Sequence, residues 1–144
     1  MIRCAGVEDI PAIIEMVGQY RCEVRPDLEM HPGTVAASVR GLITQPTGCA
    51  LLACDGGACR GVLLGPLGAS LWWPDPSAEV ALWWVDPRWR GTAAATRLMA
   101  EFEAWAARSG AARIGVTYTG KSARRYFERR GYRHADTRMM KELN

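Results

Sequence analysis

The sequence has few of the residues and segments that mark several common functional classes. It contains two histidines and five cysteines in 144 residues, and none of them lie in the spacing that zinc sites use. Its apolar stretches are interrupted by glycine, proline or charge well before membrane-spanning length. Its net charge of +3 is too small to indicate nucleic-acid binding by itself. We therefore expect a cytoplasmic protein without a metal site or a membrane span, and with reduced cysteines.

What is present is the composition of one globular domain. Hydrophobic residues make up 49% of the chain and charged residues 23%, which is typical of a protein with an ordinary core. No repeat, linker or low-complexity segment divides the sequence. The opening residues MIRCAGVEDIPAI lack the long apolar core of a secretory signal and become acidic at residue 8. We expect a single domain over residues 1–144.

The spacing of apolar residues predicts an α/β domain. Ile10, Ile13 and Val17 recur at helical intervals, and two apolar stretches around Asp55-Gly56-Gly57 have the pattern of a β-hairpin. The expected helices cover residues 7–20, 34–43, 92–109 and 122–130, the last of them capped by Ser122. The expected strands cover residues 2–5, the hairpin within 49–67, 78–85, 112–118 and 132–143. The order is β-α-α-β-β-β-α-β-α-β, and strand 78–85, apolar on both faces, is expected to be central.

The hairpin also bears on the cysteines. Cys54 and Cys59 flank its turn, so that a disulfide between them is the alternative to the reduced state. The remaining cysteines, Cys4, Cys22 and Cys49, have no such neighbour in the sequence.

The strand expected at 78–85 passes into a helix through the stretch VDPRWRGTAAATRLM. Arg88 and Arg90 flank a tryptophan, and residues 91–95 have small side chains. A helix start has unpaired N–H groups and the positive end of the helix dipole, and small side chains let a phosphate approach those groups. Two interpretations are open at this point: an anion site, or an ordinary strand-to-helix connection on a basic surface.

Together with the order of elements, this stretch resembles the acetyl-CoA signature of the GNAT N-acetyltransferase superfamily. The signature, Gln/Arg-x-x-Gly-x-Gly/Ala, is matched here by Arg88-Trp89-Arg90-Gly91-Thr92-Ala93. The resemblance covers essentially the whole chain, is strongest over residues 79–132, and is closest to small bacterial and phage members. It implies a single-domain GNAT fold, with a mixed, mostly antiparallel sheet flanked by helices, and acetyl-CoA as co-substrate. The cofactor-binding residues that it implies are Trp84, Val85, Arg88, Arg90, Gly91, Thr92, Ala93, Ala94, Ala95 and Phe127.

A second family element is the short helix near the C-terminus, here GKSARRYFERRGY. Three positions match the usual pattern: Ala123, Gly131 and Tyr132. Gly120 replaces the usual asparagine, and Phe127 stands where many members carry the tyrosine that protonates the departing CoA thiolate. Tyr126 lies one residue earlier, about 100° around a helix. It is the expected acid; the alternative is that Tyr126 is a packing aromatic and no tyrosine acts.

Glu79 is the expected general base. It precedes Val85 by six residues, which is the spacing in family members that use such a glutamate. Trp72, Trp73 and Trp83 are expected to raise the pKa of its carboxyl and to line the acceptor site by stacking or cation–π contact. The alternatives are a solvated carboxylate at a strand end and tryptophans that only pack the core. A backbone N–H near Val85 would polarise the thioester.

The sequence therefore predicts direct acetyl transfer from acetyl-CoA to a primary amine of a small molecule or protein, by a monomer or homodimer. Residues 20–33 and 67–77 are the expected acceptor loops. A basic helix carries Arg124, Arg125, Arg129 and Arg130, which we interpret as a solvated face near the CoA phosphates. Two other functions stay open. The basic helix favours a toxin-type GNAT that acetylates tRNA, and the missing tyrosine favours a non-catalytic acyl-CoA sensor.

Overall fold

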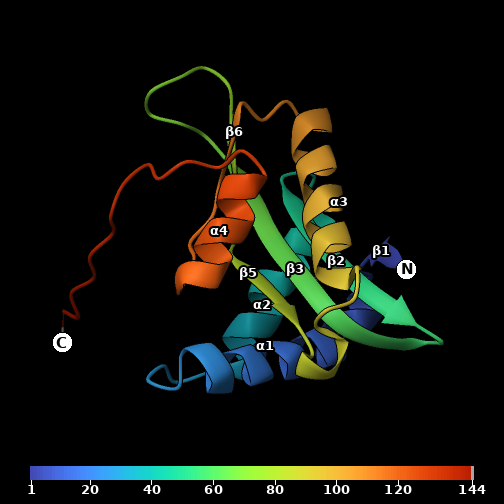
Figure 1. The fold of residues 1–144 in the computed structure, drawn as a ribbon. Coiled ribbons are helices and arrows are strands. Elements are labelled where there is room, and N and C mark those ends of the chain that lie inside the picture. Colours follow the sequence, from blue (N-terminus) through green and yellow to red (C-terminus); the bar gives the residue numbers. More distant parts are fainter. Residues whose placement is uncertain (144) are drawn as a thin grey trace.

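A mostly antiparallel sheet of six strands forms the centre of the computed structural model, which describes residues 1–143 (Figure 1). Its order is β1-β2-β3-β4-β6, and β5 pairs separately with β3. The strands are β1 (Ile2–Cys4), β2 (Gly48–Asp55), β3 (Ala58–Gly68), β4 (Ser77–Glu79), β5 (Leu82–Val85) and β6 (Arg113–Gly115). The helices are α1 (Ile10–Val24), α2 (Pro32–Thr44), α3 (Ala94–Arg108) and α4 (Lys121–Arg129), with short 3-10 turns η1 (Val7–Asp9) and η2 (Pro87–Trp89). The expected fold class is confirmed.

The central strands divide the core between two helical layers. Because side chains alternate along a strand, Leu51 of β2 faces α3 and α4 while its neighbour Leu52 faces α1 and α2. On α3, Leu98 and Phe102 lie four residues apart on one face of the helix, and both are fully buried. None of the helices in residues 1–143 is long and apolar enough to cross a membrane.

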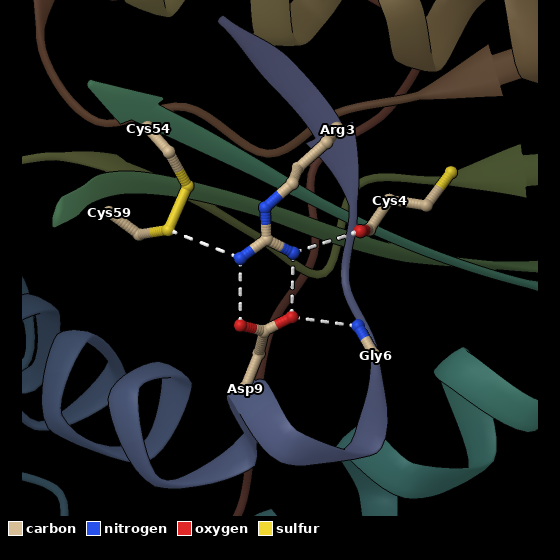
Figure 2. A network of polar contacts seen from close by, with 6 residues as sticks. All are labelled: Arg3, Cys4, Gly6, Asp9, Cys54 and Cys59. Atoms are coloured by element: carbon tan, nitrogen blue, oxygen red, sulfur yellow. Dashed lines mark hydrogen bonds and ion pairs between the residues drawn. A yellow bond between two sulfur atoms is a disulfide. The ribbon is translucent and has the colours of Figure 1, made fainter. Parts of the chain in front are cut away.

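The β2–β3 hairpin forms at the expected turn. Gly56 and Gly57 have φ values of 56° and 85°, the backbone that a tight two-residue turn needs at both positions. Cys54 and Cys59 lie opposite each other in the ladder and are joined by a disulfide (Figure 2). The expectation that all five cysteines are reduced is therefore wrong for this pair, because the register brings the two side chains within bonding reach.

Arg3 fastens the first strand to the start of α1 (Figure 2). Its guanidinium donates to the two carboxylate oxygens of Asp9 at 2.7 and 2.8 Å, and the backbone N–H of Gly6 donates to Asp9 at 2.8 Å. The hydrogen bond from Arg3 is the largest cause that lowers the pKa of the Asp9 carboxyl to about 2. Because this pKa lies below the ordinary value of 3.8, the stabilisation is complete above about pH 4 and is lost as the pH falls towards 2.

We expect Asp9→Asn to lower the free energy of unfolding by about 1–2 kcal/mol at pH 7 and by less at pH 2, where about half of the wild-type carboxyl is protonated in the folded state. Urea unfolding at the two pH values measures both losses. Asp75→Asn, in the exposed loop before β4, is the control and should cost little at either pH. Equal losses from Asp9→Asn at pH 7 and pH 2 would contradict the role assigned to the charge of Asp9.

The strand expected at 78–85 is two strands, which corrects the sequence prediction. Leu82 of β5 pairs with Leu64, whereas Ala78 of β4 pairs with Leu67, so four steps along this chain face three steps along β3. The extra residue makes a β-bulge at residues 80–81. Gly65 lies opposite the bulge. A Cβ atom added at Gly65 would collide with the carbonyl of Glu79 and would lie 2.8 Å from the ring of Phe102. A glycine is needed there because the bulge brings backbone so close.

Three other expectations near the C-terminus need correction. The strand expected at 112–118 is limited to β6, and the one expected at 132–143 does not form among the described residues; this part is the red segment that leaves the sheet in Figure 1. Tyr132 packs against the core, but the later apolar side chains do not, since Met139 is 90% exposed and Leu143 is 89% exposed. Ser122 lies inside the first turn of α4 rather than at its cap, which Gly120 occupies with φ of 82°.

Candidate functional site

The bulge leaves one edge of β5 without a partner strand. β4 continues alongside β6, while β5 pairs with β3 alone among residues 1–143. The N–H of Asp86 donates to the Arg60 carbonyl at 2.8 Å, which places alternate residues of β5 in the hydrogen-bonded positions. The N–H groups of Trp83 and Val85 therefore point away from β3, towards the open edge. An extended ligand could pair with them.

Glu79 lies where this edge begins. It is the last residue of β4, opposite Gly115 of β6, and its carboxylate occupies the space that a side chain at Gly115 would fill. Glu79 is exposed, and no ion pair or side-chain hydrogen bond holds its carboxylate within the described part of the chain. Its carboxylate thus lies at the start of the open edge of β5 without a protein group bound to it in the described residues.

The turn after β5 is shaped by Asp86. This buried carboxylate accepts from the N–H of Arg88 at 2.9 Å and pairs with the Arg88 guanidinium at 2.7 Å. The hydrogen bond from the Arg88 side chain is the largest cause that lowers the pKa of Asp86 to about 2. Asp86 therefore stays ionised at neutral pH and fixes the direction in which the chain leaves the strand.

Free N–H groups collect at the start of α3, as the sequence led us to expect. Gly91 has φ of 87°, and the first bond within the helix runs from the Arg97 N–H to the Ala93 carbonyl at 2.9 Å. Thr92 satisfies the N–H of Ala94 through its hydroxyl, at 3.3 Å. In the described residues the N–H groups of 91, 93, 95 and 96 have no acceptor. This arrangement of small residues and unpaired donors fits an anion.

An aromatic cluster lies beside the open edge, between β5 and α4. The ring of Trp83 is 5.2 Å from that of Tyr126 and 5.5 Å from that of Phe127. Phe127 is only 4% exposed, so the structure places it in the core. The Tyr126 hydroxyl and the Trp83 indole nitrogen are buried and have no hydrogen-bond partner within residues 1–143. Such orphaned donors are costly unless a ligand or water satisfies them.

The other expected acceptor residues are not brought to this cluster. Trp72 is 78% exposed, and Trp73 lies over the guanidinium of Arg113, 3.2 Å from the ring centroid. Arg113 pairs with Ser77, at the end of β4 away from the bulge. Trp84, which was expected among the cofactor-binding residues, faces the opposite helical layer, where its indole N–H donates to Glu23 at 2.9 Å.

A cleft of about 690 Å³ opens on that opposite layer. Its walls include Trp84 and Pro87, next to residues of α1 and the start of α2. Five of its lining residues come from the expected acceptor loop 20–33: Arg21, Cys22, Glu23, Met30 and Pro32. The second expected loop, 67–77, contributes none to it.

Within residues 1–143 no three His, Cys, Asp or Glu side chains are grouped as a metal site requires.

Comparison with known proteins places this geometry in context. A model of the acetyltransferase (GNAT) family matches residues 12–132. A possible acetyltransferase from Clostridium difficile 630 has a TM-score of 0.81 at 14% identity, over 100% of this chain and 97% of that one. An aminoglycoside acetyltransferase from an uncultured soil metagenomic sample, in complex with sisomicin, has a TM-score of 0.79 at 14% identity, over 100% and 96%. An acetyltransferase from Trypanosoma brucei scores 0.78 at 14% identity, over 99% of each chain. No curated protein sequence matches.

Proposed function

Since this chain belongs to the acetyltransferase (GNAT) family, we propose that it transfers the acetyl group of acetyl-CoA directly to a primary amine. One observation carries the proposal: the free N–H groups of Trp83 and Val85 at the open edge of β5 lead into the free N–H groups at the start of α3. The first set suits the amide-bearing arm and thioester of acetyl-CoA, and the second suits its pyrophosphate.

The pyrophosphate is assigned to backbone rather than to side chains. The residues proposed for it are Gly91, Thr92, Ala93, Ala94 and Ala95, whose small side chains leave the turn accessible. Space around Gly91 supports this, because an added side-chain carbon would meet no atom within 4 Å. The positive end of the α3 dipole adds attraction for the anion.

We assign the two proton transfers to Glu79 and Tyr126. Glu79 takes a proton from the ammonium of the acceptor, whose nitrogen then attacks the thioester carbon. The N–H of Trp83 or Val85 donates to the carbonyl oxygen as negative charge develops on it. The carbon–sulfur bond breaks and the Tyr126 hydroxyl gives its proton to the thiolate. The second proton of the attacking nitrogen is lost as the amide forms, and the Tyr126 oxygen regains a proton from solvent. The lack of a protein partner for either group supports these roles.

For the acceptor we propose a small cationic amine that enters by the cleft. Its walls are largely apolar, and the carboxylate of Glu15 on its rim has no ion pair in the described residues. A second candidate is an aminoacyl-tRNA, because the last 32 residues carry nine basic and three acidic side chains. Thiol release from acetyl-CoA with aminoglycosides, polyamines, peptides and aminoacyl-tRNA separates the two. Release with aminoacyl-tRNA alone would replace the first candidate by the second.

Acetyl-CoA at about 100 times its Kd should raise the melting temperature by roughly 5–10 °C, because it binds the folded state alone. We expect Gly91→Glu to abolish this shift, since a carboxylate then occupies the phosphate position. Ala95→Glu should act in the same way without the positive φ that strains a side chain at Gly91. Gly41→Glu, on α2 where nothing lies within 4 Å, is the matched control and should keep the shift. An undiminished shift in both turn variants would refute the assignment.

A further inference from the structure

The guanidinium of Arg90, the residue just before the proposed phosphate turn, is hydrogen-bonded to two other parts of the protein. Its two terminal nitrogens donate to the two oxygens of Glu23, at 2.6 Å each. Its Nε donates to the carbonyl of Val85 at 3.0 Å. Three of its five N–H groups therefore have acceptors in the protein, and each edge of the guanidinium that could grip a phosphate with two N–H groups already has one of them bound.

Glu23 extends this arrangement to the helical layer behind the sheet. It lies in the last turn of α1, and its Oε1 also accepts from the indole N–H of Trp84 at 2.9 Å. The hydrogen bonds from Arg90 and Trp84 lower the pKa of the Glu23 carboxyl, with Arg90 as the larger cause. We call Glu23, Trp84, Val85 and Arg90 the brace. It joins α1, β5 and the turn before α3.

The brace lies at the end of β5, next to the open edge of that strand. Val85 is the last residue of β5, and both its N–H and its carbonyl point away from β3. Arg90 satisfies the carbonyl and leaves the N–H free. A strand paired on one side only has few other constraints, so Arg90 fixes the end of β5 relative to the turn. On the other face, Glu23 and Trp84 line the cleft.

We infer that Glu23 and Arg90 are positioning residues that hold the N–H groups of β5 in register for the thioester, and that Arg90 does not bind phosphate. This inference rests on the proposed function. It differs from the expectation, drawn from the sequence, that the charge of Arg90 serves the anionic cofactor. Two-point contact between this guanidinium and a phosphate would break a bond to Glu23 or to Val85, and the carboxylate of Glu23 already neutralises its charge.

Activity with two different thioesters distinguishes a positioning role of Arg90 from binding of phosphate by Arg90. Acetyl-CoA and S-acetylpantetheine carry the same reacting group, but only acetyl-CoA has phosphates. We expect Arg90→Met and Glu23→Gln each to lower kcat/KM by roughly 10-fold or more with both thioesters, because misplaced donors affect the shared part. The double variant should be no worse than either single variant, since both remove the same contact. Arg40→Met, an exposed arginine of α2, is the control and should change neither value.

A loss with acetyl-CoA alone, or losses that multiply in the double variant, would overturn the inference. So would tighter binding of CoA to Glu23→Gln, which is expected if a released Arg90 can bind phosphate. If the wild type transfers no acetyl group from either thioester, the proposed function fails, and the Kd values of CoA and pantetheine decide about the brace. Equal weakening of the two ligands by Arg90→Met then supports it, and selective weakening of CoA or no weakening refutes it.

Discussion

We expect Glu79→Gln to lower kcat by roughly 10²–10⁴-fold while the Kd for acetyl-CoA changes little. Glutamine keeps the size and polarity of the side chain but cannot take a proton from the ammonium of the acceptor. Steady-state kinetics over pH 5–9 with the best acceptor, together with a CoA binding assay, measure these effects.

Two further variants sharpen the assignment of Glu79. Gly115→Ala places a side chain where the Glu79 carboxylate lies, so it should lower kcat without removing the carboxylate. Glu101→Gln, an exposed glutamate of α3, is the matched control and should leave kcat unchanged. If Glu79→Gln keeps most of the wild-type rate at every pH, the proton is taken by another group or by water.

The sequence was informative where structure depends on neighbouring residues. The β2–β3 turn follows from two consecutive glycines, and the buried face of α3 follows from Leu98 and Phe102 at helical spacing. The turn that we propose for phosphate has a local basis too, because small residues next to a strand end are visible in a short stretch. Each of these features is determined locally.

The features that sequence reasoning missed depend on distant contacts. Glu23 lies 67 residues before Arg90, in a helix expected to end at residue 20, and no motif joins the two. The bulge at residues 80–81 interrupts a stretch that is continuously apolar, so no break in pattern marks it. Its one local sign is Gly65 on the neighbouring strand, whose meaning appears only when the register is known. The open edge, and with it the candidate site, depends on that register.

The surroundings of the Tyr126 hydroxyl predict separate effects of Tyr126→Phe on stability and on rate. The Tyr126 hydroxyl is buried and has no partner among residues 1–143, so its removal should leave the protein as stable as the wild type or slightly more stable. If the hydroxyl protonates the CoA thiolate, the same change should lower kcat by about 10²-fold. Loss of rate without loss of stability separates an acid from a packing aromatic, because the packing surface of the ring is unchanged.

The converse substitution tests the position that carries the tyrosine in many members of the family. Phe127 is 4% exposed and packs against Trp83 and Tyr132, with ring centroids 5.5 and 5.2 Å away. Phe127→Tyr adds a hydroxyl to this core, so we expect a loss of about 1–3 kcal/mol in the free energy of unfolding and no gain in kcat. Thermal unfolding and single-turnover kinetics of both variants measure the two effects. If Tyr126→Phe leaves kcat unchanged and Phe127→Tyr raises it, the thiolate leaves without a proton from Tyr126, and a tyrosine at position 127 can supply one.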